Sequence, residues 1–212
     1  MKSTRGAGAK PDARQKLLAA ALDAIREQGY AGTSVEDLCS RAGVTKGAFF
    51  HHFKSKEALA VAAANHWSEI TGAFFADAPY HQLEDPLERF LGYLDFRKSI
   101  LRGSLPDFTC LAGTLIQEVY GTHSEIRDAC AESIQTHASR LVPDIAAAMA
   151  IRDIRGDWTA EGLAMHTQAV LQGAFVLAKA TGGAEVAVAS VDHLRRYVEL
   201  LFRSSTTVHK ED

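Results

Sequence analysis

Cysteine is scarce in this chain, and no two cysteines are spaced to hold a metal. The 212 residues contain three cysteines, Cys39, Cys110 and Cys130, without a CxxC pair. An odd number without metal-ligand spacing favours free thiols in a reducing compartment. A thiol switch at Cys110 or Cys130 is an alternative, although free buried cysteines are more often structural than redox-sensing.

Long apolar runs are missing as well. The N-terminal segment is basic but lacks the apolar stretch of a signal peptide. A membrane span needs about 18 apolar residues in succession. The nearest run, residues 163–181, is interrupted by His166, Gln168, Gln172 and Lys179. We therefore expect a cytoplasmic protein with no membrane partner.

Catalytic signatures are absent too. The chain has no G-x-S-x-G, HExxH, P-loop or CxxC framework. Adjacent His51 and His52 would point about 100° apart on a helix, which is a poor arrangement for one metal ion. No shared spacing links the later histidines, which are His81, His123, His137, His193 and His209. We expect neither an enzyme nor a cofactor or metal site.

Strand patterns are rare, whereas helix patterns are common. Val, Ile and Thr do not alternate with polar residues, and apolar residues recur at helical spacing instead. The hydrophobic fraction of 47% is enough for a sizeable core. Helix starts are predicted at Asp12 with Gln15, at Thr33 with Glu36, at Thr45 and at Ser55, and helix ends at Gly29 and Gly43. The sequence predicts an all-α fold of about nine helices.

Positive charge is concentrated at the N-terminus. Residues 1–56 hold ten Lys and Arg against five Asp and Glu, whereas the remainder holds 13 against 21. A basic end on an acidic body suggests that the first quarter of the chain binds a polyanion. The alternative is chance clustering in a short segment.

The most informative segment is TSVEDLCSRAGVTKGAFFHHFKSKEAL, residues 33–59. It is typical of two short helices joined by a tight glycine turn and followed by a third helix that braces them. Small residues, Cys39 and Ala42, would let the two helices cross closely. The outward side chains are cationic or hydrogen-bonding, on a helix narrow enough for a major groove, and comprise Lys46, His51, His52 and Lys54.

The stretch GVTKGAFFHHFKSKEAL resembles the DNA-binding segment of the TetR/AcrR family of regulators, and the resemblance covers about residues 12–60. It implies DNA contacts from both ends of the motif, at Thr33, Thr45, Lys46, Gly47, Phe50, His51, His52 and Lys56. Lys56 would hold a phosphate at the start of the next helix. Phe50 stands where the family usually has Tyr, so a hydroxyl-to-phosphate bond worth about 1 kcal/mol is lost.

The remainder resembles the family's ligand-binding and dimerisation domain. Two long helices are predicted at about residues 159–181 and 184–203, with broad apolar faces. In relatives such helices pair across a homodimer, and the residues expected there are Leu163, Val170, Leu171, Phe175, Val191, Leu194, Val198, Leu201 and Phe202. The alternative is that both helices bury these faces within one chain.

A polar helix face within about residues 109–130 is the expected site of ligand sensing. Cys110, Thr114, Gln117 and Glu118 share helical spacing. A mixed aromatic and polar pocket would be completed by His66, Trp67, Phe74, Met165 and His166. Ordinary packing is the alternative for each of these residues.

These observations together predict a flexible basic arm (1–10), a three-helix helix-turn-helix domain (11–56) and a larger domain for ligand binding and dimerisation (57–206). The expected function is sequence-specific transcriptional regulation, by a dimeric repressor that an unknown small molecule releases from a palindromic operator. The helix that begins at Ser55 would be the lever between the two domains. A ligand-dependent activator and a non-specific architectural DNA-binding protein are the alternatives.

Overall fold

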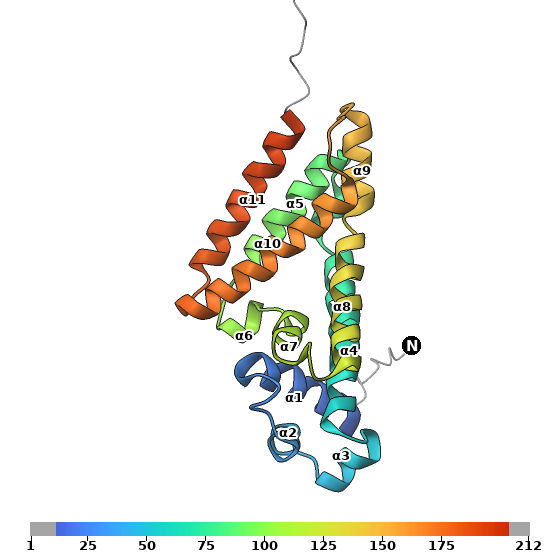
Figure 1. Cartoon of the computed structure of the whole chain (residues 1–212), viewed down its shortest axis with the longest axis vertical. Helices are drawn as coiled ribbons and strands as arrows, with labels where there is room; N and C mark the ends of the chain where they lie inside the picture. Colours follow the sequence, from blue (N-terminus) through green and yellow to red (C-terminus); the bar gives the residue numbers. More distant parts are fainter. Residues whose placement is uncertain (1–11, 204–212) are drawn as a thin grey trace, which may run out of the picture.

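The structure is a computed structural model that describes residues 12–203, and these residues form eleven α-helices and one short 3₁₀ helix, without a strand (Figure 1). The helices are α1 (Ala13–Gln28), α2 (Val35–Ala42), α3 (Lys46–His52), α4 (Lys56–Ala76), η1 (Pro79–Gln82), α5 (Pro86–Ser99), α6 (Leu105–Phe108), α7 (Leu111–Val119), α8 (Ser124–Ser139), α9 (Val142–Ile151), α10 (Ala160–Thr181) and α11 (Glu185–Arg203). The predicted all-α fold is confirmed, and the helices beyond the expected nine include the four-residue α6. The basic arm predicted at residues 1–10 lies outside the described residues.

Capping side chains set the starts of the N-terminal helices. Asp12 opens α1 through a capping box with Gln15. Thr45 and Ser55 open α3 and α4, each accepting a hydrogen bond from the backbone N–H three residues later. These three starts are as predicted, because the capping signal is local and needs no tertiary partner.

The start of α2 differs from the prediction by one residue. Ser34, not Thr33, is the N-cap, and its hydroxyl accepts from Asp37 N at 3.0 Å. Thr33 is buried and donates its hydroxyl to Gly29 O at 2.7 Å. The capping box expected between Thr33 and Glu36 is therefore wrong, because the Thr33 hydroxyl closes the loop after α1 instead.

The three N-terminal helices, called the head below (α1, α2 and α3), share their core with the rest of the chain. Leu17, Leu38 and Phe49 lie in one buried cluster with Leu59 of α4 and Leu115 of α7. α1 packs on α4 and α7 as well as on α2 and α3. A displacement of α4 or α7 is therefore felt directly by the head, since a close-packed core transmits movement rather than absorbing it.

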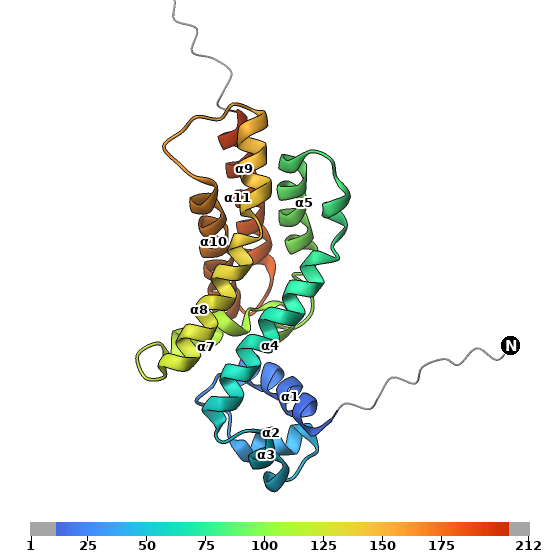
Figure 2. The same cartoon turned by 90° about the vertical axis from the view of Figure 1, so that its right-hand side faces the viewer.

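The body above the head is a stack of antiparallel and crossed helices around a second core (Figure 2). α4 runs up from the head and packs along α8, while α5, α9, α10 and α11 enclose the upper part of the molecule. α10 and α11 begin and end within about a residue of the predicted bounds. Within residues 12–203, no helix combines the length and apolar character needed to span a bilayer.

Candidate DNA-binding helix and effector pocket

α3 presents an open N-terminus and an exposed outer face. The Thr45 hydroxyl accepts from Ala48 N at 3.1 Å, and the backbone at Gly47 has open space beside it, with Thr45 Oγ1 the nearest atom to a Cβ at 3.7 Å. His51 and His52 are exposed, and their rings meet edge to face with centroids 4.9 Å apart. Phe50 is 55% exposed. The predicted DNA contacts of α3 thus lie together on one accessible surface.

Lys46, at the first position of α3, forms an ion pair with Glu36 of α2. Both side chains are exposed, and the hydrogen bond from Lys46 lowers the pKa of Glu36. Glu36 is therefore ionised at neutral pH and competes for the Lys46 ammonium group. A phosphate that binds Lys46 must displace a weak surface ion pair, which costs little.

Lys56 is placed differently from the role that the resemblance implies. Its Nζ atom donates to Tyr30 O and to Thr33 O, both at 2.9 Å, and lies 4.1 Å from the centre of the Tyr30 ring. Burial lowers the pKa of this ammonium group. The charge expected to hold a phosphate is thus used inside the molecule, where it fastens the α1–α2 loop to α4.

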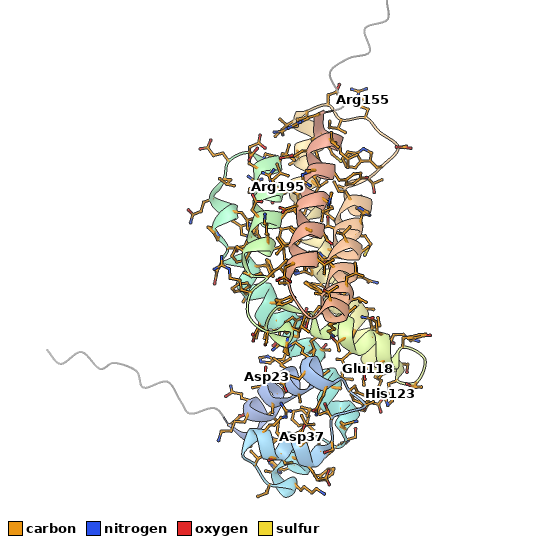
Figure 3. The ribbon with its side chains drawn as sticks, turned by 90° about the vertical axis from the view of Figure 1, so that its left-hand side faces the viewer. Asp23, Asp37, Glu118, His123, Arg155 and Arg195 are labelled. Atoms are coloured by element: carbon orange, nitrogen blue, oxygen red, sulfur yellow. The ribbon has the colours of Figure 1, made fainter. Side chains whose placement is uncertain are left out.

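Glu118 fastens the same loop to α7. Its carboxylate accepts from Tyr30 N and Ala31 N, each at 3.1 Å, at the boundary between head and body (Figure 3). Gly29 has a φ of +81°, and a Cβ there would collide with the Glu118 carboxylate. Glu118, expected in the ligand site, therefore connects the head to the body.

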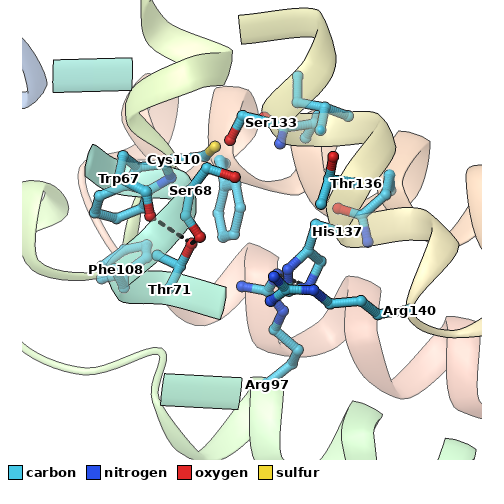
Figure 4. A pocket seen from close by; sticks show the side chains of 14 residues that line it. Trp67, Ser68, Thr71, Arg97, Phe108, Cys110, Ser133, Thr136, His137 and Arg140 are labelled. Atoms are coloured by element: carbon cyan, nitrogen blue, oxygen red, sulfur yellow. Dashed lines mark hydrogen bonds between the residues drawn. The ribbon is translucent and has the colours of Figure 1, made fainter. Parts of the chain in front are cut away.

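A narrow pocket lies in the body between α4, α5, α6, α8 and α10 (Figure 4). Its volume is about 40 Å³, room for only a few water molecules. Of the predicted ligand residues it contains Trp67 and Cys110. The full lining is Trp67, Ser68, Thr71, Arg97, Phe108, Cys110, Ser133, Ile134, Thr136, His137, Arg140, Gln168, Gln172 and Phe175.

One end of this pocket, which we call the cationic end, is formed by Arg97, His137 and Arg140 (Figure 4). Arg97 donates from Nη2 to His137 Nε2 at 2.8 Å and from Nε to the Tyr93 hydroxyl at 2.9 Å. Because a guanidinium group only donates, His137 Nε2 must be an acceptor, and the ring is neutral. Burial, with Arg97 and Arg140 nearby, lowers the pKa of His137 to about 2.

A second, larger hollow of about 560 Å³ adjoins the cationic end and shares His137 and Arg140 with it. Aromatic side chains line much of it, including Phe75, Tyr80 and Phe90. Its one carboxylate, Asp144, pairs with Arg89 at 2.7 Å.

The other predicted ligand residues do not converge on the narrow pocket. Thr114, Gln117 and Glu118 line a separate open depression of about 210 Å³, which Cys110 also borders and in which Lys179 Nζ donates to Thr114 Oγ1 at 2.7 Å. Elsewhere, His66 lies 3.6 Å from Glu69, Phe74 packs on Phe96, Met165 is exposed, and His166 lies against Tyr197. Helical spacing places residues of one helix on a shared face, but it does not predict which side chains of α4 and α10 meet those of α7.

Cys130 is fully buried, and burial raises the pKa of its thiol to about 12. The thiol is therefore protonated at neutral pH, and a protonated thiol is a poor nucleophile. This disfavours Cys130 as a redox switch.

Most of the residues predicted at the dimer interface are buried within the chain itself. Leu163, Leu171, Phe175, Val191, Leu194, Val198 and Phe202 belong to the body core, with Val170 and Leu201 packed against it. Burial within one chain, the alternative, accounts for the seven core residues, whereas Val170 and Leu201 are only partly buried, and the dimer interface itself stays a prediction. Other large apolar side chains on α10 and α11 are exposed, at 42% to 59%, and comprise Met165, Val176, Leu177, Tyr197 and Leu200.

Sequence reasoning missed Arg97, His137 and Arg140. Arg97 and His137 are 40 residues apart, and no local spacing links α5 to α8. The polar run on α8 is a signal for His137 and Arg140, but it also suits a solvated helix face, and it says nothing of Arg97 on α5.

A short two-helix motif with an exposed second helix, joined to an all-helical body with an internal pocket, defines a helix-turn-helix regulator with a sensing domain. Two family patterns match the chain: "Bacterial regulatory proteins, tetR family" over residues 17–63, and "Tetracyclin repressor-like, C-terminal domain" over residues 86–194. The chain belongs to the TetR family of DNA-binding transcriptional regulators, which are not enzymes.

Relatives and solved structures agree with this assignment. The regulator LmrA of Bacillus subtilis is 32% identical over 130 residues, which are 60% of this chain and 68% of LmrA. The regulator AcuR of Cereibacter sphaeroides is 28% identical over 182 residues, 82% of this chain and 80% of AcuR. A TetR-family regulator from Agrobacterium tumefaciens has a similar fold, with a TM-score of 0.77 at 20% identity, over 87% of this chain and 96% of that one.

Proposed function

We propose that this regulator is a homodimeric repressor that binds a palindromic operator and leaves it when a small molecule enters the narrow pocket. On the DNA side, α3 would enter the major groove, with Lys46, His51 and His52 at base edges or phosphates and Thr45 and Gly47 against the backbone. Phe50, exposed on the same helix, would contact the groove without a hydroxyl.

The continuity of α4 is the observation that carries this proposal. Leu59 and Ala63 of α4 are buried in the cluster that includes the head, and Trp67 and Thr71 of the same helix line the pocket. Ligand pockets usually measure about 300–1,000 Å³, whereas this one measures about 40 Å³. A ligand must therefore push the lining helices apart, and a displacement of α4 moves the head.

Release then follows as a population shift between a closed form that binds DNA and an expanded form that does not. To move such an equilibrium from 1:99 to 99:1, a ligand must bind the expanded form about 10⁴-fold more tightly than the closed form. The loop contacts made by Lys56 and Glu118 keep the head aligned with α4 and α7 in the closed form.

Dimerisation would use the exposed apolar face of α10 and α11, formed by Met165, Val176, Leu177 and Tyr197. Exposed apolar side chains that follow one another along two adjacent helices indicate a surface that another protein covers. A two-fold axis there would set two copies of α3 at a fixed separation, as a palindrome with half-sites about 34 Å apart requires.

Selection of bound sequences from random duplex DNA by the purified protein tests this proposal. We expect enrichment of an inverted repeat with half-sites one helical turn or a multiple of it apart. Enrichment of a single half-site would contradict the dimer. Salt-sensitive binding with no preferred sequence would favour an architectural DNA-binding protein instead.

A further inference from the structure

The cationic end of the narrow pocket holds two arginines and no carboxylate. Among the described residues, no Asp or Glu lines this pocket, and neither Arg97 nor Arg140 forms an ion pair. The surrounding body is acidic, since residues 57–212 carry 13 Lys and Arg against 21 Asp and Glu. The pocket therefore carries positive charge inside a body whose net charge is negative.

Arg97 is held in place entirely by neutral groups. It donates to the Tyr93 hydroxyl and to His137 Nε2, and its Cζ atom lies 4.2 Å from the centre of the Phe75 ring. Gln168 supports the same hydroxyl at 3.4 Å. These partners fix the direction of the guanidinium group but leave its charge uncompensated, as a preformed anion site requires.

Arg140 is placed by the absence of a side chain on α4. A Cβ on Gly72, which is buried in α4, would overlap the Arg140 guanidinium group. Gly72 thus lets the guanidinium lie directly against the α4 backbone. The Arg140 guanidinium group donates no hydrogen bond to any of the residues that the structure describes, so its N–H donors are available to a ligand.

The opposite end of the pocket is apolar. Trp67 and Phe108 lie there, away from Arg97 and Arg140 (Figure 4), and Phe175 also lines the pocket. The hydroxyl groups of Ser68, Thr71, Ser133 and Thr136 line the pocket as well. A ligand complementary to this lining has an anionic head and a small apolar body.

We propose that the effector is a small organic carboxylate whose head binds between Arg97 and Arg140 and whose apolar body lies against Trp67 and Phe108. Guanidinium groups match the planar carboxylate geometry, and a carboxylate relieves the mutual repulsion of the two arginines. The role of this ligand in regulation rests on the proposed function, whereas its binding does not.

Fluorescence titration tests the binding directly, without DNA. Trp67 is isolated as a reporter by Trp158→Phe, because the chain has two tryptophans. The probes are two matched pairs: benzoate with benzamide, and hexanoate with hexanamide. We expect at least one carboxylate to bind saturably, about tenfold or more tightly than its amide.

Variants locate the binding. Arg140→Gln should weaken carboxylate binding about tenfold, and Arg140→Lys should recover part of it, since the charge returns without the planar fork. Arg127→Gln replaces an exposed arginine of α8 that pairs with Asp128 and should leave carboxylate binding unchanged. Amides that bind as tightly as carboxylates, equal affinity in Arg140→Gln, or no saturable carboxylate binding would overturn the proposal.

The DNA readout separates this inference from the proposed function. A carboxylate that binds at Arg140 without releasing the selected operator would leave the ligand class standing and refute ligand release. Release of the operator by the amides alone would refute a carboxylate as the ligand and leave ligand release standing.

Discussion

Acidification should destabilise this protein through His137 in particular. The ring lies among Phe75, with centroids 4.8 Å apart, Tyr93, Arg97 and Arg140. Burial and the two arginines lower the pKa of His137 from 6.5 to about 2. The folded state therefore keeps the ring neutral at a pH where the unfolded chain takes up a proton.

Proton linkage gives the direction and the size of the change in the free energy of unfolding with pH. Stability from the neutral ring is complete above the unfolded pKa of about 6.5 and is lost as pH falls toward the folded value. The loss is about 1.4 kcal/mol per pH unit below 6.5, so it amounts to about 2 kcal/mol at pH 5 relative to pH 7.5.

Urea unfolding followed by circular dichroism at pH 7.5, 6.0 and 5.0 measures this loss. His137→Gln keeps an acceptor for Arg97 but cannot titrate, so its free energy of unfolding should fall by about 2 kcal/mol less than that of the wild type. His193→Gln, at an exposed position on α11, should retain the wild-type slope. Equal pH slopes in wild type and His137→Gln would show that His137 does not cause the loss of stability in acid.

Three further predictions concern the contact between Glu118 and the head, the exposed apolar face of α10 and α11, and the DNA-binding helix α3. Glu118→Gln removes the charge from two hydrogen bonds to the head, so the free energy of unfolding should fall by about 1–2 kcal/mol. Unchanged hydrogen exchange in the α1–α2 loop would show that Glu118 does not fasten this loop to α7. Leu177→Glu places a charge on the exposed face of α10, so sedimentation equilibrium should show monomers, whereas Ser139→Glu on α8 should leave dimers. His51→Ala should change the selected DNA sequence more than the salt dependence of binding, and an identical selected sequence would exclude His51 from base contact.

Local signals explain what could be predicted from the sequence. The caps at Asp12, Thr45 and Ser55 depend on neighbouring residues only, so the starts of α1, α3 and α4 could be predicted from the sequence. Thr33 shows the limit of such signals, because its hydroxyl bonds to Gly29 O and leaves the cap to the next residue.

The pocket and the dimer face depend on contacts between distant segments. Arg97 contacts His137 only because α5 packs near α8, and the sequence of neither helix predicts this contact. Periodicity identified the apolar faces of α10 and α11, but it cannot tell burial within a chain from burial between chains. Phe175 is therefore core, whereas Val176, one position later, is exposed.

Filling the narrow pocket should release DNA, and a pocket-filling substitution tests this without a known ligand. Ser133 of α8 is 8% exposed and lines the pocket, so Ser133→Phe forces extra volume between α8 and α4. Overpacking costs about 1–3 kcal/mol, and if that cost falls on the closed form, affinity for the selected operator should drop about tenfold. Ser139→Phe, exposed on the same helix, serves as the matched control. Folded Ser133→Phe dimers that bind the operator as tightly as the wild type would exclude expansion of the pocket as the trigger for release.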